Sequence, residues 1–242
     1  MKNWFTVCFV LLLISCKKES ENLNFISLNE IYPMAVGKTF TYRLDSTVTV
    51  NFGASLATRS YLAKDSVEST FLDAQNRKSF RIFRYLRDTL AVQPWKFTAT
   101  YLTTFTENTV EFVDNNLRYI VLSNPVSENT FWKGNAYINT ILPSSYYFLD
   151  NWDYQYKNLN QSFTTKKGVI QNTYTVLQQN TQIPATFNPS VYNEKSYSIE
   201  VYAKGIGLIY KEFLHYIWQP TPVPAKFQDD SYGIKLNLIS YN

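Results

Sequence analysis

Apolar and polar residues alternate with a period of two along several parts of this chain. In residues 38–50, one parity carries Phe40, Tyr42, Leu44, Val48 and Val50. The other parity is mostly threonine and charged residues, with Thr41 and Arg43 near its start. Alternation of this kind predicts a β-strand with one buried face.

Three more segments repeat the alternation. In residues 95–105 the apolar parity holds Trp95, Phe97, Ala99, Tyr101 and Phe105, and in residues 234–238 it holds Ile234, Leu236 and Leu238. In residues 196–201 the pattern sets Tyr197, Ile199 and Val201 on the core face, opposite Ser196, Ser198 and Glu200. Each segment is therefore predicted to be a half-buried strand.

Weaker apolar runs predict further strands at residues 60–71, 79–87, 110–113, 117–122, 131–138, 169–178 and 208–218. The breaks at residues 114–116 and 166–168 are rich in Asp, Asn, Lys and Gly and fit hairpin turns. Residues 183–189 and 220–224 are marked by proline and are predicted to lie outside the sheet. Only residues 145–152 suggest a short helix.

These patterns predict an all-β fold. No shift in composition and no internal repeat divides the chain, so we expect a single antiparallel β domain over residues 29–242. A sandwich and an open or half barrel both fit the strand pattern.

The first residues of the chain have the layout of a secretory signal peptide. Lys2 gives a basic start, the apolar run Trp4–Ile14 follows, and Cys16 comes after a small residue. The apolar run is about 11 residues long, whereas a bilayer-spanning helix needs about 20. We therefore expect residues 1–15 to be removed and residues 16–28, which are polar and aperiodic, to form a flexible tether.

The ending Leu13-Ile14-Ser15-Cys16 resembles a bacterial lipobox. The resemblance implies cleavage before Cys16 and lipid attachment, such as palmitate, to its thiol, so that the membrane is a partner. The charged stretch at residues 17–21 resembles export signals in lipoproteins of Bacteroidota. It implies an outer-membrane lipoprotein, displayed on the periplasmic face or on the cell surface.

Two segments of the body resemble uncharacterised cell-envelope lipoproteins of Bacteroidota. The segment YPMAVGKTFTY at residues 32–42 resembles their entry into a first strand, and YAKGIGLIYKE at residues 202–212 resembles a late turn and strand start. The resemblance implies a β fold and brings no activity and no functional residues with it.

Composition removes several classes of function. The 242-residue chain has a net charge of +4 without basic clusters, so nucleic acid is not an expected partner. Its one histidine, His215, lies in an apolar run and fits a structural role. With Cys8 removed and Cys16 lipidated, a zinc site of His and Cys alone is excluded, although oxygen-ligated calcium is not. No catalytic group, metal or cofactor is expected.

Residues 146–156 form the most distinctive segment, since six aromatic residues lie among Asp, Asn and Gln. Trp152, Tyr154 and Tyr156 fall on one face of an extended chain and could stack on sugar rings. Asp150 and Asn151 would then supply hydrogen bonds at the end of that row. The alternative is that the same three rings fill the core.

Three hypotheses for function follow. The first is a non-catalytic envelope lipoprotein that binds a glycan or peptide ligand or serves as a scaffold. The second is a glycan-acting hydrolase with two carboxylates, drawn from Asp150, Asp153, Glu194, Glu200, Glu212, Asp229 and Asp230. The third is a carrier of an apolar ligand such as a lipid, which would need an apolar cavity of about 300 Å³ or more.

Overall fold

The computed structural model describes residues 26–242, except Asn129, Lys167 and Pro222. The signal peptide, Cys16 and the tether up to residue 25 therefore lie outside the described residues. Where the description begins, Ile26 and Leu28 already pack against the core. Ser27 caps a single helical turn, α2 (Leu28–Ile31), by accepting a hydrogen bond from the backbone N–H of Asn29.

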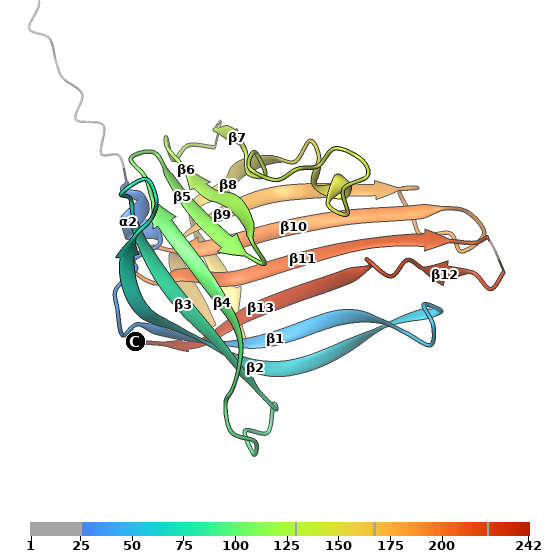
Figure 1. Cartoon of the computed structure of the whole chain (residues 1–242), viewed down its shortest axis with the longest axis horizontal. Helices are drawn as coiled ribbons and strands as arrows, with labels where there is room; N and C mark the ends of the chain where they lie inside the picture. Colours follow the sequence, from blue (N-terminus) through green and yellow to red (C-terminus); the bar gives the residue numbers. More distant parts are fainter. Residues whose placement is uncertain (1–25, 129, 167, 222) are drawn as a thin grey trace, which may run out of the picture.

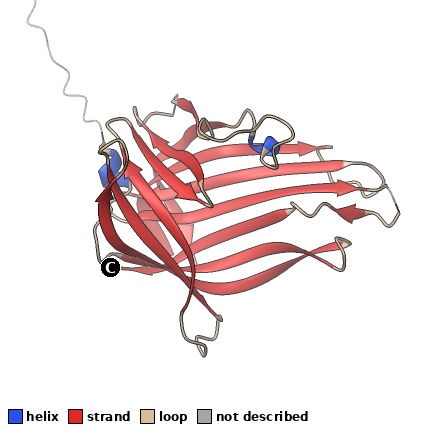
Figure 2. Ribbon diagram, in the orientation of Figure 1, coloured by secondary structure: helices blue, strands red, loops and turns tan. Residues whose placement is uncertain are grey.

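The regular structure of the described chain is almost entirely β-strand (Figure 2). Apart from the strands and α2, the one regular element among the described residues is the 3₁₀ turn η2 (Tyr147–Leu149). The strands are β1 (Thr39–Val50), β2 (Ser55–Leu72), β3 (Lys78–Arg87), β4 (Lys96–Phe105), β5 (Thr109–Asp114), β6 (Leu117–Ser123), β7 (Phe131–Lys133), β8 (Asp153–Thr165), β9 (Gly168–Ile183), β10 (Asn193–Ala203), β11 (Gly207–Gln219), β12 (Lys226–Phe227) and β13 (Tyr232–Tyr241).

All strands pair in one antiparallel sheet that curls on itself (Figure 1). The order is β6-β5-β4-β3-β2-β1-β13-β11-β10-β9-β8-β7, with β12 beside β11. The two ends of the sheet meet where the backbone N–H of Ile120 donates to the carbonyl oxygen of Gly134 at 2.8 Å, just beyond β7. The all-β antiparallel prediction is confirmed, and the architecture is a nearly closed barrel rather than a sandwich.

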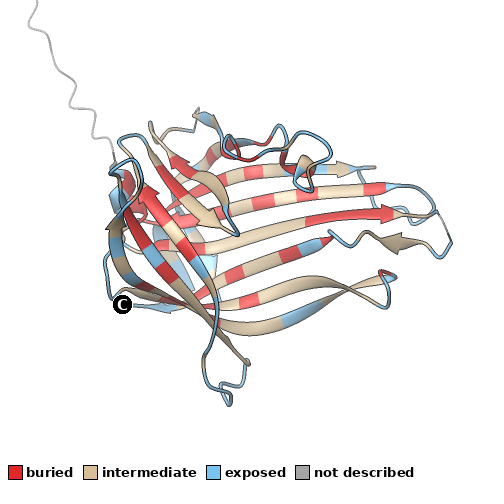
Figure 3. Cartoon of the chain, viewed as in Figure 1, coloured by how far each residue is buried: buried red, intermediate tan, exposed pale blue. Residues whose placement is uncertain are grey.

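The alternation predicted for β1 sets the inner face of the barrel. Phe40, Tyr42 and Leu44 are buried, and Leu236 and Leu238 of β13 are buried beside them (Figure 3). Buried side chains gather in two clusters, one of which contains these five residues. The described helices include none that is long and apolar enough to cross a membrane.

The prediction for β10 holds for Val201, which is fully buried, but fails for the rest of the strand's predicted core face. Ser196, Ser198 and Glu200 are buried, whereas Tyr197 and Ile199 are only half-buried. The polar side chains can lie inside because neighbouring strands supply partners for them, as when the Ser198 hydroxyl donates to Gln178 Oε1 at 2.5 Å. The interior of the barrel is therefore polar along this strand.

A β-bulge also divides the face predicted for residues 95–105. The pairing of β3 with β4 shifts between Arg84 and Tyr85, so that Tyr85 pairs with Phe97. The Phe97 ring packs edge-on against Phe83 at 5.5 Å and is 51% exposed. Tyr101, in contrast, is buried. Since a bulge inserts one residue, it moves Phe97 to the opposite face from Tyr101.

The weaker predictions succeed in part. Asn115 and Asn116 have positive φ angles and form the turn between β5 and β6 as expected. The strand predicted for residues 131–138 ends at Lys133, and residues 145–152 form only the turn η2. Strand β8 was not among the predicted strands. The described residues of the loop at 220–224 lie outside the sheet, as predicted.

Candidate functional site: a cavity inside the barrel

Of the two arrangements that the sequence left open for Trp152, Tyr154 and Tyr156, an exposed row and a place in the core, the structure has the second. Trp152, Tyr154 and Tyr156 are 3%, 2% and 0% exposed. Each polar end is satisfied within the protein: the Trp152 indole N–H donates to the Phe148 carbonyl at 2.8 Å, and the Tyr154 hydroxyl donates to Asn135 Oδ1 at 2.9 Å. The expectation of a surface platform for sugar rings is therefore wrong.

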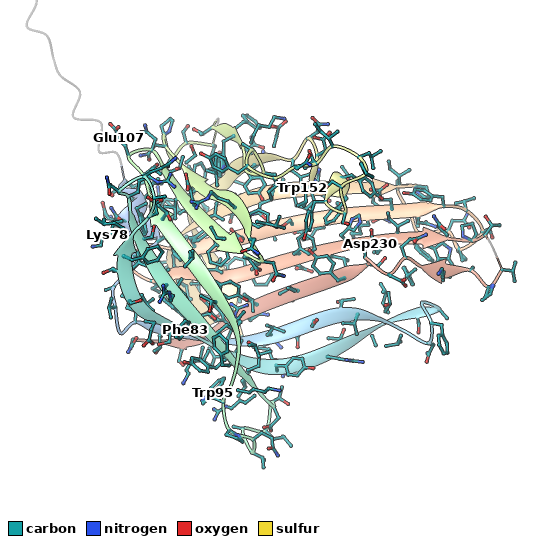
Figure 4. All side chains as sticks on the ribbon, in the orientation of Figure 1. Lys78, Phe83, Trp95, Glu107, Trp152 and Asp230 are labelled. Carbon is teal, nitrogen blue, oxygen red and sulfur yellow. The ribbon has the colours of Figure 1, made fainter. Side chains whose placement is uncertain are left out.

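Trp152 and Tyr154 nevertheless line a cavity of about 210 Å³ inside the barrel. Trp152, labelled in Figure 4, is the last residue of the loop that joins β7 to β8. Asp150 and Asn151 are exposed on this loop, where the Asn151 amide donates to the Asp150 carboxylate at 2.5 Å. Neither of these two residues lines the cavity.

A smaller cavity of about 70 Å³ adjoins the larger one. Six residues line both: Phe112, Asp114, Val121, Glu200, Lys211 and Ile234. At the other end of the larger cavity, Tyr146 and Tyr232 are 38% and 41% exposed. The two cavities are therefore neighbours inside the barrel, and the larger one also has partly exposed residues in its lining.

The wall of the smaller cavity holds an ion pair between Asp65 of β2 and Arg84 of β3. Arg84 Nε and Nη2 each donate to one carboxylate oxygen at 2.6 Å, which is bidentate geometry. The two side chains are only 12% and 11% exposed. Burial by itself lowers the pKa of Arg84, but the Asp65 carboxylate outweighs it and raises that pKa above its ordinary value. Arg84 is therefore a fixed cation.

A second ion pair lies between the two cavities. Glu200 of β10 and Lys211 of β11 are directly paired across the strands, and Lys211 Nζ approaches Glu200 Oε1 at 2.9 Å. The Tyr202 hydroxyl donates to the other oxygen of Glu200 at 2.6 Å. Burial and the Glu200 charge together raise the pKa of Tyr202 well above its ordinary value. This phenol therefore stays a neutral donor.

Asp114, at the end of β5, is the third carboxylate that lines the site. Burial raises the pKa of Tyr101 to about 12, with Arg84 opposing and Asp114 adding to the rise. Burial also raises the pKa of Tyr119, and the charges of Tyr232 and Asp114 contribute. The Asp114 carboxylate therefore acts on the phenols around the cavity.

The remaining candidate carboxylates lie elsewhere. Of those considered for hydrolysis, only Glu200 lines the cavities, while Asp153 pairs with Lys133 on the surface and Glu212 pairs with Lys235. Among residues 26–242, as far as they are described, no group of three or more His, Cys, Asp and Glu side chains could hold a metal ion.

His215 is fully buried and lines neither cavity. Its Nδ1 lies 2.9 Å from the Ser196 hydroxyl, and its ring stacks on Phe148 at 4.0 Å. Burial lowers the pKa of His215, so the ring is held neutral in the core. These contacts fit the structural role expected from the sequence.

No protein-family model and no curated protein matches this chain. Two crystal structures are similar in shape. One, described as a "putative lipoprotein" from Parabacteroides distasonis, has a TM-score of 0.41 and 10% identity over 88% of this chain and 98% of that one. The other, described as a "putative exported protein with YmcC-like fold" from Bacteroides fragilis, has a TM-score of 0.39 and 10% identity over 87% and 99%.

Sequence reasoning missed most of this site. Asp65, Arg84 and Lys211 come from separate strands, and nothing local in the sequence joins them. One signal was present: the polar parity of β10, with two serines followed by Glu200, can equally indicate a strand that faces a polar interior. Only the partners on β9 and β11 show which face is inside.

Proposed function

We propose that this protein is a non-catalytic cell-envelope lipoprotein, anchored through lipid on Cys16, that binds a small amphipathic ligand inside its barrel. The observation that carries the proposal is the pair of adjoining cavities, of about 210 Å³ and about 70 Å³, which share six lining residues. Their walls combine aromatic rings with a few fixed charges, which is the composition typical of small-molecule sites. Trp152 and Tyr154 would contact the ligand from the interior side.

The site fits a small amphipathic ligand better than it fits the two alternatives. The buried ion pairs in the cavity walls are costly neighbours for a wholly apolar ligand such as a lipid carrier would hold. A hydrolase would need one carboxyl group as acid and another as base or nucleophile. Of the three carboxylates that line the cavities, Asp65 and Glu200 are each held by a cation, in pairs with Arg84 and Lys211, which leaves only Asp114.

Filling the larger cavity tests the proposed site. Leu117 lines this cavity and is only half-buried, so Leu117→Trp is expected to occupy the space with limited strain. Benzyl alcohol, which combines a ring with a hydroxyl, is a suitable probe for calorimetric titration. We expect the unmodified protein to bind it and Leu117→Trp to lose at least tenfold in affinity.

The matched control is Ile120→Trp, on the same strand but outside both cavities, which should bind benzyl alcohol normally. Circular dichroism of both variants verifies that the sheet is intact. Absence of binding by the unmodified protein, or equal binding by both variants, would show that the cavity is not the ligand site.

Anchoring has its own test, because Cys16 is the only cysteine left after removal of residues 1–15. We expect Cys16→Ser to abolish incorporation of labelled fatty acid and to release the protein from the membrane fraction. Cys8→Ser is the control, since Cys8 lies within the apolar run, and it should leave labelling unchanged. Continued labelling of Cys16→Ser would rule out the lipid anchor.

A further inference from the structure

The charges of the larger cavity do not balance. Its lining contains two carboxylates, Asp114 and Glu200, and one cation, Lys211. Lys211 already pairs with Glu200 at 2.9 Å, and Tyr202 satisfies the other Glu200 oxygen. Within the described part of the chain, the Asp114 side chain has neither a salt bridge nor a hydrogen bond. One negative charge therefore faces the cavity without a protein partner.

The backbone holds Asp114 at this position. It is the last residue of β5, directly before the Asn115–Asn116 turn, whose residues have φ angles of 48° and 63°. In Figure 1 this turn projects toward β11 and β13, and Asn115 lines the same cavity as Phe213 and Tyr232. Asp114 is half-buried at the end of this hairpin and lines both cavities.

Aromatic rings surround the rest of this cavity. The aromatic lining residues are Phe112, Tyr119, Tyr146, Trp152, Tyr154, Phe213 and Tyr232. Some of these rings pack on one another: Phe213 and Tyr232 stack at 4.8 Å, and Trp152 lies 6.1 Å from Phe213. The faces of aromatic rings carry partial negative charge and attract cations, most strongly where water is excluded.

We propose that the ligand of this cavity carries an organic cation, a quaternary ammonium or an amine, held by Asp114 within the ring of aromatic side chains. This inference rests on the proposed function and adds the chemical class of the ligand. The uncompensated carboxylate attracts a positive charge, and the rings bind the alkyl groups around it. The larger cavity, at about 210 Å³, has the volume of roughly seven waters at about 30 Å³ each. This is enough room for a small alkylammonium group.

A pair of probes that differ only in charge tests the inference. Choline carries a trimethylammonium group, and neopentylcarbinol is its uncharged carbon isostere. Both are titrated calorimetrically into the full chain in a non-ionic detergent. We expect choline to bind at least tenfold more tightly than the isostere, and this advantage to shrink as salt screens the charge.

Asp114→Asn removes the charge and keeps the shape of the side chain. We expect this variant to bind choline about tenfold more weakly while binding neopentylcarbinol as before, which also shows that the cavity is still folded. Glu107→Gln is the matched control: Glu107 lies far from Trp152 in Figure 4 and lines neither cavity, so choline binding should not change.

Equal affinity for the two probes, no binding of choline, or unchanged choline binding by Asp114→Asn would each overturn the assignment of a cationic ligand. The benzyl alcohol titration separates this failure from failure of the proposed function. If benzyl alcohol binds and Leu117→Trp abolishes that binding, the cavity is a ligand site for uncharged molecules. If benzyl alcohol also fails to bind, the proposed function fails as well.

Discussion

Arg84→Met is expected to lower the free energy of unfolding by about 3–5 kcal/mol. The substitution keeps much of the apolar stem but removes the cation, so it leaves the Asp65 carboxylate buried and unpaired. A buried charge without a partner costs several kcal/mol, whereas the intact bidentate pair offsets that cost. Urea unfolding, followed by tryptophan fluorescence, measures the change.

Arg43→Met is the matched control, because Arg43 pairs with Asp45 at 2.8 Å on the more exposed side of a neighbouring strand. An exposed pair contributes about 0–1 kcal/mol, so this variant should lose no more than that. The double variant Asp65→Leu with Arg84→Met should recover most of the loss, since no buried charge remains. Equal losses for Arg84→Met and Arg43→Met would show that Asp65 is solvated.

Gly134→Ala is expected to destabilise the barrel by about 1–3 kcal/mol or more through overpacking. A Cβ atom at position 134 would lie 2.3 Å from the Tyr154 ring. That ring cannot move away freely, because it is buried and packed against Trp132, and because its hydroxyl donates a hydrogen bond to Asn135. Thermal unfolding compared with the unmodified protein measures the effect.

The same substitution in a Tyr154→Leu background provides the control. With the ring removed, Gly134→Ala should cost little, so the two changes should be strongly non-additive. Additive losses would mean that position 134 is sensitive for a reason other than contact with Tyr154.

The pattern of residues predicts the strands well where one face of a strand is apolar and the other is polar. The alternation in residues 38–50 identifies β1 and its buried residues Phe40, Tyr42 and Leu44. The Asp-Asn-Asn break likewise identifies the turn between β5 and β6. Both depend on local preferences, namely the period of the pleat and the tolerance of Asn for positive φ.

The same reasoning fails where a side chain's environment comes from distant segments. The pattern in residues 196–201 suggests that Ser196 and Glu200 are exposed, but the closed barrel places them inside, with partners on neighbouring strands. A one-residue bulge reverses the face of Phe97 without any mark in its own segment. The sequence correctly shows that aromatic residues gather around Trp152. It does not show that they are buried, because their burial depends on the sheet that curls around them.

By itself, the sequence determines that this is a β protein with strands near residues 38–50 and 234–238, because alternation with a period of two has a direct local cause. Whether those strands form a sandwich or a barrel was decided only in three dimensions, where the meeting of Ile120 with Gly134 joins the two ends of the sheet. The cavity is likewise a property of the tertiary structure. Asp114 and Lys211 are far apart in sequence, and only closure of the barrel lines one site with both.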